Sequence, residues 1–247
     1  MIKLKLFKIY SKGLTTMDNV NISKEFLYDK TYKCPVCESY FKAKAVRSGK
    51  ARLISKDSDF MPRYQNINPL YYDVIICPKC GYGALIKYFD KIKSSQCQLI
   101  REKVTSKFKP RIYPDVYDVD IAIERHKLAL VNTIVKNARV SEEAYTCLKI
   151  AWLYRIKGDN LNELKFLMQS LTKFKEAYEK EPHPICGMNT FTLTYLIGEL
   201  ERRCGNNENA LQWFGKVIVN PGVNSRLKEL ARDQKDLIKE NTLNRDK

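Results

Sequence analysis

The spacing of apolar residues divides the chain into a front part with strand-like runs and a back part with helical periodicity. In the front part, residues 71–76 form an aromatic and β-branched run, and residues 39–46 alternate polar and apolar side chains. Both patterns are typical of β-strands. After Gly83 the period changes, because apolar residues such as Leu85 and Phe89 recur at helical spacing. We therefore expect short strands up to about residue 83 and helices beyond it.

From about residue 118 to the C-terminus the pattern is helical throughout. Gly158 and Pro182 interrupt it at two of the expected helix ends. We expect the later helices at about 161–180, 189–204 and 207–219, with a last, highly charged helix from about Ser225. The prolines Pro110 and Pro114 end the preceding helical segment, and we place a domain boundary near residue 112.

The back part contains a segment that follows the spacing of a tetratricopeptide repeat. Gly198, Ala210, Phe214 and Pro221 stand where this repeat places two small residues, an aromatic residue and a proline. The small residues would let two antiparallel helices approach, and Phe214 would fill the groove between them. An earlier, looser unit contains Trp152 and Gly158, and its longer second helix ends at Pro182. The separation between Gly158 and Gly205 exceeds the regular period of about 34 residues, so the repeats are irregular. An ordinary helical bundle is the alternative.

Eight cysteines are present, and four of them form two Cys-Pro-x-Cys pairs. Two thiolates in one tight turn can reach the same ion, and the backbone N–H groups of the turn then point at sulfur. A proline inside each turn fixes φ, and Gly81 permits a positive φ after the second pair. Paired spacing without a route to an oxidising compartment indicates metal binding. We predict that one structural Zn²⁺ is bound by Cys34, Cys37, Cys77 and Cys80.

This set of ligands indicates a structural centre and not a catalytic one. Four thiolates close the coordination shell, whereas a catalytic zinc keeps one position open for water. The sequence has neither a phosphate-cradling glycine-rich loop nor a Gly-x-Ser-x-Gly turn. His126 and His183 lack a local catalytic partner, so we expect surface or capping roles for both. The remaining cysteines, expected to be buried apolar residues, are Cys97, Cys147, Cys186 and Cys204. We predict that the protein is not an enzyme.

Together these patterns predict an α+β protein in which a small zinc ribbon precedes an all-α, tetratricopeptide-like domain. The ribbon and its following helices would span residues 28–112, and the helical domain residues 113–247. Residues 1–27 would form an N-terminal tail. This tail is either disordered or in part a mis-called start, because Met17 is an alternative initiator to Met1.

Positive charge is concentrated in the front part of the chain. The formal net charge is +16, and residues 1–113 hold 23 Lys+Arg against 9 Asp+Glu, whereas residues 114–247 hold 21 against 19. The sequence has neither an apolar run of the ~18 to 20 residues that a membrane span needs nor a secretory signal. We expect a cytoplasmic protein whose basic excess belongs to the zinc half.

Basic residues in the spacer between the cysteine pairs alternate with aromatic ones. The candidates for contacts with phosphate or nucleic acid are Arg47, Lys50, Arg52 and Arg63. Alternatively, the aromatic residues form the core of the ribbon and the cations are solvated. Asp57 and Asp59 could pair with Arg52 or Arg63 and fix the loop.

Several of these blocks resemble an uncharacterised bacterial family, catalogued as domain of unknown function 2225. The blocks lie at residues 34–37, 46–52, 57–60, 68–72 and 77–82 in the front part, and at 151–155, 198–203 and 231–234 in the back part. The resemblance covers about residues 28–240. It implies a bacterial cytosolic protein with a zinc-ribbon-like start and a tetratricopeptide-like end, and it implies neither an activity nor catalytic residues.

From these observations we expect a protein–protein interaction scaffold. Stacked helical hairpins leave a concave face that binds a peptide or a helix of a partner protein. The zinc half would present a rigid basic surface. The alternative is a nucleic-acid-binding protein that uses this basic half.

Overall fold

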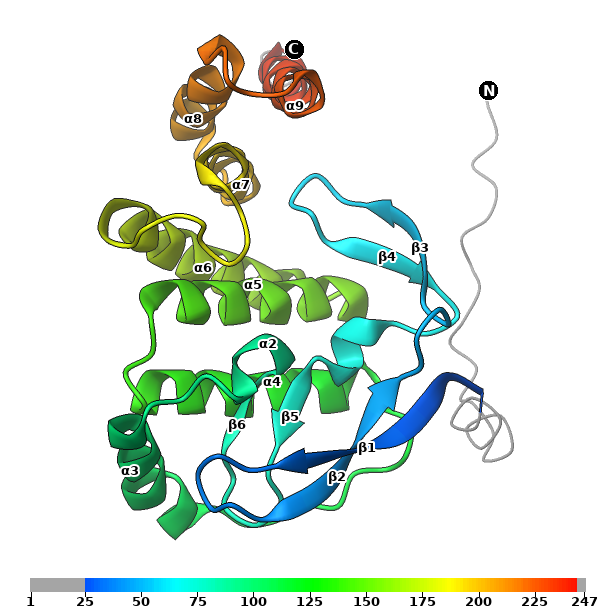
Figure 1. Cartoon of the computed structure of the whole chain (residues 1–247). Coiled ribbons are helices and arrows are strands. Elements are labelled where there is room, and N and C mark those ends of the chain that lie inside the picture. Colours follow the sequence, from blue (N-terminus) through cyan, green and yellow to red (C-terminus); the bar gives the residue numbers. More distant parts are fainter. Residues whose placement is uncertain (1–24, 244–247) are drawn as a thin grey trace.

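The computed structural model describes residues 25–243, in which three small β-hairpins precede a stack of helices (Figure 1). The strands are β1 (Leu27–Lys33), β2 (Tyr40–Val46), β3 (Arg52–Lys56), β4 (Pro62–Gln65), β5 (Val74–Ile76) and β6 (Gly83–Leu85). They pair in sequence order as three antiparallel ribbons. The α+β class is confirmed. Most of the predicted tail, including the choice between Met1 and Met17, lies outside the described residues.

The strand predicted at residues 71–76 is shorter than expected. Asn68 accepts a hydrogen bond from the Leu70 amide, and Pro69 opens a 3₁₀ helix, η1 (Pro69–Tyr72), so that β5 begins only at Val74. The Tyr72 ring is buried against Tyr117, with ring centroids 4.7 Å apart. Local capping and this contact therefore outweigh the strand propensity of the two tyrosines.

The helices predicted at 161–180, 189–204, 207–219 and from Ser225 lie within a few residues of those bounds, and other helices precede them. In chain order, the helices are α2 (Ile86–Phe89), α3 (Ser94–Lys103), η2 (Thr105–Lys107), α4 (Val119–Val135), α5 (Val140–Lys157), α6 (Asn160–Lys180), α7 (Thr190–Arg203), α8 (Asn207–Val219) and α9 (Ser225–Leu243). Gly158 ends α5 in the left-handed conformation at φ 78°. Among residues 25–243, no helix combines the length and apolar character that a membrane span requires.

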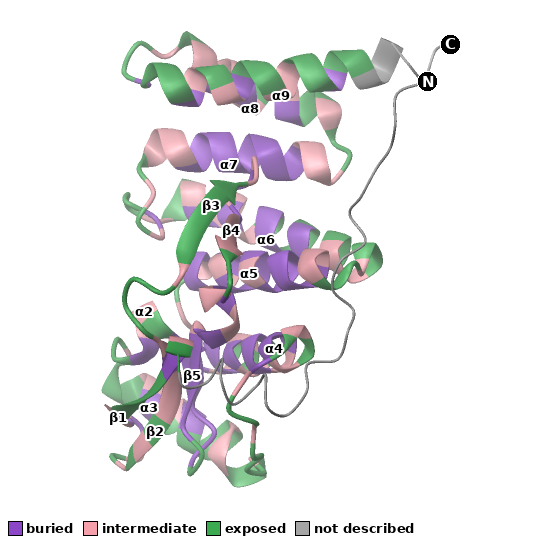
Figure 2. Cartoon of the chain, turned by 90° about the vertical axis from the view of Figure 1, so that its right-hand side faces the viewer, coloured by how far each residue is buried: buried purple, intermediate pink, exposed green. Residues whose placement is uncertain are grey.

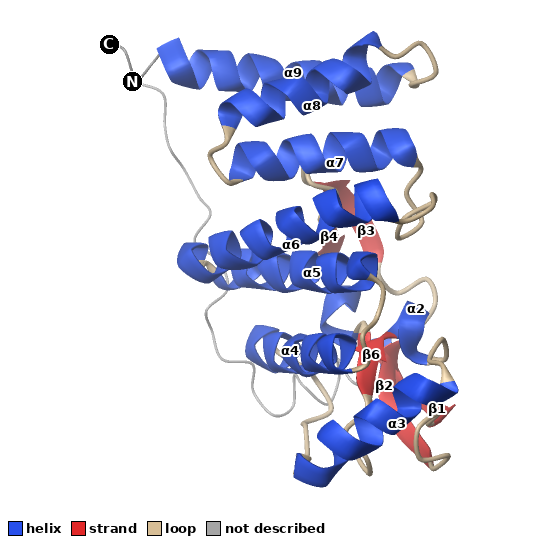
Figure 3. Cartoon of the chain, turned by 90° about the vertical axis from the view of Figure 1, so that its left-hand side faces the viewer, coloured by secondary structure: helices blue, strands red, loops and turns tan. Residues whose placement is uncertain are grey.

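Helices α4 to α9 stack on one another, with α4 beside the β-ribbons and α9 at the opposite end (Figure 3). Gly198 allows α7 to approach α8 closely, because a Cβ at this position would lie 3.0 Å from the Phe214 ring. Ala210 and Phe214 are both fully buried there. The packing role predicted for these three residues is thus confirmed, and the back half is largely helical.

The β3–β4 hairpin does not stay with the other ribbons but lies along α5 and α7 (Figures 1 and 2). At its tip, Met61 is completely buried in the core shared by α4 to α7. Phe60 contacts Tyr195 of α7 at a centroid distance of 5.3 Å. Side chains from residues 57–61 therefore cross the boundary predicted near residue 112, and they occupy one side of the helical stack.

Candidate metal centre

Each cysteine pair lies in the turn of a β-hairpin. Cys34 and Cys37 connect β1 to β2, and Cys77 and Cys80 connect β5 to β6. The two turns have the same hydrogen-bond pattern. The Glu38 amide donates to the Cys34 carbonyl at 2.8 Å, and the Gly81 amide donates to the Cys77 carbonyl at 2.9 Å. Two similar turns, contributed by separate hairpins, thus present their thiols to one point.

The four sulfur atoms form a compact cluster. Cys34 and Cys80 have their sulfurs 3.6 Å apart, as do Cys37 and Cys77, and all four lie within 4.8 Å of one another. A tetrahedral ion with metal–sulfur bonds of about 2.3 Å would hold its sulfurs about 3.8 Å apart. The observed spacing brackets this value, so the arrangement of the thiols fits one metal ion.

Hydrogen bonds within the cluster distribute charge unevenly among its thiols. The Cys34 and Cys80 thiols hydrogen-bond the Cys77 sulfur and lower the pKa of Cys77 to about 2. The contact with Cys77 in turn raises the pKa of Cys34 to about 12, and contacts with Cys34 and Cys77 raise the pKa of Cys80. Without a cation, close packing of the sulfurs therefore opposes a second negative charge. A divalent ion would allow all four thiols to bind as thiolates.

Backbone amides also point toward the sulfurs, as the Cys-x-x-Cys spacing predicts. The amides of Val36 and Cys37 hydrogen-bond the Cys34 sulfur, and the amides of Lys79 and Cys80 hydrogen-bond the Cys77 sulfur. These donors stabilise negative charge on sulfur whether or not a metal is bound. The turns are therefore organised as anion-stabilising loops.

Gly81 is required by the geometry of the second turn. Its φ of 75° lies in the left-handed region that the sequence predicts for it. A Cβ at this position would lie 2.4 Å from the Phe108 ring. The equivalent position of the first turn, Glu38, has a φ of 60°. Each turn thus leaves the site through a left-handed residue, and in the second turn only glycine fits.

Helices α3 and α4 and the 3₁₀ helix η2 hold both turns in place. The Arg101 guanidinium donates two hydrogen bonds to the Val36 carbonyl, at 3.0 and 2.7 Å. Thr105 donates to the Cys80 carbonyl at 2.9 Å, and Asn132 donates to the Gly81 carbonyl at 3.2 Å. The residues that brace the site therefore lie up to about a hundred positions from the first cysteine. A search for local motifs does not detect residues this far away.

The cluster is closed to solvent on most sides. Cys34, Cys77 and Cys80 are at most 1% exposed, and Cys37 is half-buried. Within residues 25–243, the group that could hold a metal ion consists of these four cysteines and includes no histidine or carboxylate. Four soft sulfur donors in a tetrahedral cluster match structural zinc sites. Chemically, the arrangement can hold an ion and cross-link two hairpins.

Three of the four cations predicted to contact phosphate already have partners in the structure. Arg63 forms a bidentate ion pair with Asp57, at 2.6 and 2.9 Å, as one predicted alternative has it. Lys50 lies 3.4 Å from Glu25, and Arg47 packs over the Tyr28 ring. Arg52 is exposed and has no ion pair among the described residues. Their predicted contact with nucleic acid stays a prediction.

A buried ionic network lies at the tip of the β3–β4 hairpin. Asp59 is 0% exposed, and it accepts hydrogen bonds from Arg155 at 2.6 and 2.9 Å and from the Trp152 indole at 2.9 Å. Ser58 donates to Glu199 at 2.6 Å, and Glu199 in turn is paired with Arg203 at 2.7 Å. The network therefore anchors the hairpin to α5 and α7.

Only an indirect signal for this network is present in the sequence. Its members lie in three of the blocks that resemble the family, around residues 57–60, 151–155 and 198–203. One alternative from the sequence pairs Asp57 and Asp59 with Arg52 or Arg63, and Asp57 does pair with Arg63. The dominant partner of Asp59, however, is Arg155, which is 96 positions away.

The prediction for His126 is wrong, because this residue has neither a surface nor a capping role. His126 is 0% exposed within α4, and Nδ1 hydrogen-bonds the Ala122 carbonyl at 2.8 Å. Burial lowers the pKa of His126 to about 4. His183 is exposed, as expected. Of the single cysteines, Cys97 and Cys147 are buried, whereas Cys186 and Cys204 are half-buried.

Comparison with known proteins agrees with the resemblance seen in the sequence. The model of a family described as "Uncharacterized protein conserved in bacteria (DUF2225)" matches residues 27–238. An uncharacterised protein of Borreliella burgdorferi is 22% identical over 161 residues, which are 61% of this chain and 53% of that protein. The chain thus spans about half the length of this curated relative. No solved structure matches.

Proposed function

The chain belongs to the DUF2225 family of bacterial proteins, and from this premise we propose that it is a non-catalytic, cytoplasmic zinc protein that acts as a protein–protein interaction scaffold. The cluster of four thiols supports zinc as the ion, because it offers a closed tetrahedral set of soft donors. Eight free cysteines are consistent with a reducing compartment. The metal would hold the β1–β2 and β5–β6 hairpins together.

The observation that carries the scaffold proposal is an apolar stripe on α6. Leu161 is 80% exposed, Leu164 is 39% exposed and Met168 is 54% exposed. Their spacing of three and four residues places them on one face of the helix. An exposed apolar helix face of this kind is suited to pack against the apolar face of a partner helix. We propose that the hairpin formed by α7 and α8 is tetratricopeptide-like, and that the α6 stripe alone contacts the partner.

A positive charge beside the stripe indicates that the partner is acidic. Lys165 is exposed between Leu164 and Met168, and it has no ion pair among the described residues. A partner helix with acidic residues flanking its apolar face would therefore complement α6. The proposed occupant is an acidic, amphipathic helix of another protein.

Affinity capture from the native cell with the full-length chain tests this proposal. The double variant L161E/M168E changes the stripe, and V219E is the matched control because Val219 is 79% exposed on α8. We expect one protein to be enriched by the wild type and by V219E but lost with L161E/M168E. Equal enrichment by all three chains, or none by any, would contradict the proposal.

Nucleic-acid binding by the zinc half is the second candidate. Its support is that Arg52 is exposed and free of ion pairs within the described part of the chain, and that Arg47 is stacked on the Tyr28 ring. A nuclease-treated arm of the same capture separates the candidates. A partner lost on nuclease treatment favours nucleic acid, and a partner retained favours the scaffold.

A further inference from the structure

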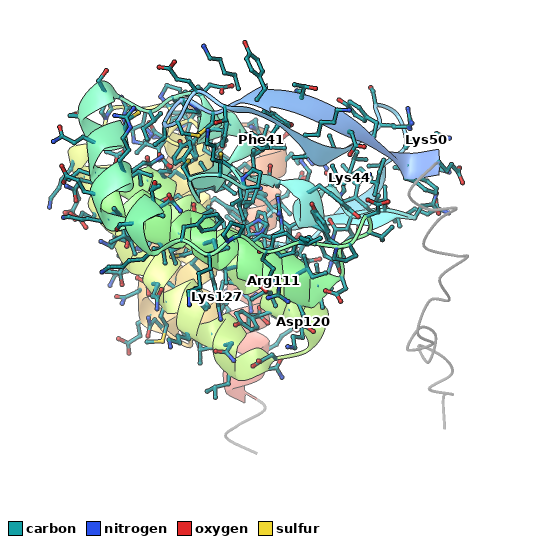
Figure 4. All side chains as sticks on the ribbon, turned by 90° about the horizontal axis from the view of Figure 1, so that it is seen from below. Phe41, Lys44, Lys50, Arg111, Asp120 and Lys127 are labelled. Carbon is teal, nitrogen blue, oxygen red and sulfur yellow. The ribbon has the colours of Figure 1, made fainter. Side chains whose placement is uncertain are left out.

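A hollow of about 580 Å³ opens on the underside of the molecule, between β2, the segment from Lys103 to Tyr117, and α4. Figure 4 shows this face, with Lys44 on β2 and Arg111 in the segment that precedes α4. The volume is within the range of about 300–1,000 Å³ that is usual for small-molecule sites. None of the four cations predicted from the sequence lines the hollow.

The wall of the hollow has a cationic excess. Seven basic and three acidic side chains line it, a balance of +4. The carboxylates are already engaged, because Lys44 pairs with Asp29 and Asp115 at 3.1 and 3.0 Å, and Arg111 pairs with Glu124. The lining lysines that have no ion pair among residues 25–243 are Lys42, Lys103, Lys107 and Lys109. Their charge is available to a ligand.

A buried arginine completes this arrangement. Arg125 is 4% exposed and lines the hollow, yet it has no carboxylate partner in the described part of the chain. Its Nη2 donates to the Val74 carbonyl at 2.8 Å, whereas its Nε is buried without a hydrogen-bond partner. The Glu124 carboxylate acts on this charge through space but is already paired with Arg111, and a buried charge without an ion pair of its own is unfavourable. An anion bound in the hollow would supply the missing negative charge.

Aromatic side chains also line the hollow. Phe108 and Tyr113 are half-buried in its wall. Tyr113 is held in place because its hydroxyl donates to Glu124 at 2.8 Å and its ring lies 4.9 Å from the Arg125 guanidinium. Half-buried rings beside unpaired cations offer a stacking surface for a base next to contacts for its phosphate.

We propose that this hollow binds a nucleotide unit, with its phosphate at the unpaired lysines and Arg125 and its base against Phe108 or Tyr113. Free nucleotides and single-stranded RNA share this chemistry, and either can supply the unit. The site is independent of the α6 stripe, so the scaffold can be correct or wrong without affecting it. It also differs from the Arg47 and Arg52 surface of the second candidate.

Binding measurements on the full-length chain test the proposal. The probes are a fluorescent adenosine triphosphate analogue and a fluorescein-labelled oligouridylate, followed by anisotropy over a series of salt concentrations. The double variant K103E/K107E changes two exposed lysines of the hollow. R226E/R232E carries the same charge change on two exposed residues of α9, and R47E/R52E tests the other cationic surface.

We expect K103E/K107E to weaken binding roughly tenfold or more, because charge-assisted contacts are lost. The slope of log affinity against log salt concentration should decrease by about one for each phosphate contact that is lost. R226E/R232E should leave affinity within about twofold. Binding of the analogue identifies free nucleotide as the source, and binding of the oligouridylate alone identifies single-stranded RNA.

Three results would overturn the proposal. One is that neither probe binds at low salt. Another is that K103E/K107E weakens binding no more than R226E/R232E does. The third is that R47E/R52E abolishes binding while K103E/K107E retains it, which would assign nucleic-acid contact to the other surface.

Discussion

Asp59 is a fully buried carboxylate held by arginines from two helices of the other half of the chain. Burial raises the pKa of this carboxyl, but the hydrogen bonds from Arg155 and the charge of Arg203 outweigh burial and bring the pKa below its ordinary value of 3.8. Asp59 is therefore charged in the folded protein. Its negative charge is paired with Arg155 and Arg203 only when the β3–β4 hairpin packs against α5 and α7.

We predict that Asp59→Asn lowers the free energy of unfolding by about 3–5 kcal/mol, because it leaves the buried Arg155 charge incompletely paired. Urea unfolding followed by tryptophan fluorescence measures this, since the Trp152 indole donates to Asp59. The control is Asp236→Asn. The ion pair between Asp236 and Lys239 is exposed, so it contributes less than about 1 kcal/mol to the free energy of unfolding. Equal effects of the two substitutions would show that the network does not hold the hairpin.

His126 gives a second prediction at this scale, through pH. Its pKa is about 4 in the folded protein against an ordinary 6.5, so the unfolded chain binds more protons between these values. Stability should therefore be fully present above pH 6.5 and fall by an amount on the order of 3 kcal/mol as the pH is lowered to about 4.

Urea midpoints recorded between pH 4 and 7 measure this change. His126→Gln should flatten the dependence, whereas His183→Gln, at an exposed position, should retain it. An unchanged slope in His126→Gln would assign the pH dependence to other groups.

At the scale of elements, the prediction concerns the close packing of α7 on α8. Replacing a glycine within a helix by alanine usually stabilises a protein, but at this contact we expect the opposite. Gly198→Ala would place a Cβ 3.0 Å from Phe214 and is expected to destabilise by about 1–3 kcal/mol. Gly215, also in a helix, has open space around its Cβ position, so Gly215→Ala should stabilise by about 0.5–1 kcal/mol. Thermal unfolding of both variants tests the contrast, and stabilisation by both would show that α7 and α8 are not closely packed.

Local signals also explain which elements could be predicted from the sequence. Helix ends at Gly158 and the strand at 39–46 depend on nearby residues, and they were predicted well. The run at 71–76 was not, because capping by Asn68 and contact with Tyr117 decide its conformation. Local signals are also enough for the candidate metal centre, because its four cysteines can be predicted from their spacing along the chain.

Long-range contacts account for what could not be predicted. Arg101, Thr105 and Asn132 brace the cysteine turns from helices that are distant in sequence. Arg125 and the lysines of the hollow come together only when the segment ahead of α4 folds against β2. No periodicity or motif spacing encodes such encounters, because each partner alone looks like an ordinary surface residue.

For the whole molecule, the proposed metal ion would tie two hairpins into a unit braced by α3 and α4. Removing the ion would leave four crowded thiols, of which Cys34 and Cys80 resist ionisation because their pKa values are raised. We predict that a chelator lowers the thermal midpoint by several degrees and that added Zn²⁺ restores it. A midpoint that does not respond to either would argue against a structural ion.

The most direct measurement is the metal content of the purified full-length chain, determined by elemental analysis. We predict one zinc per chain for the wild type and for Cys204→Ser, whose thiol lies outside the cluster, and a clear loss of zinc for Cys77→Ser. Absence of stoichiometric metal from the wild type, or full zinc content in Cys77→Ser, would contradict this prediction.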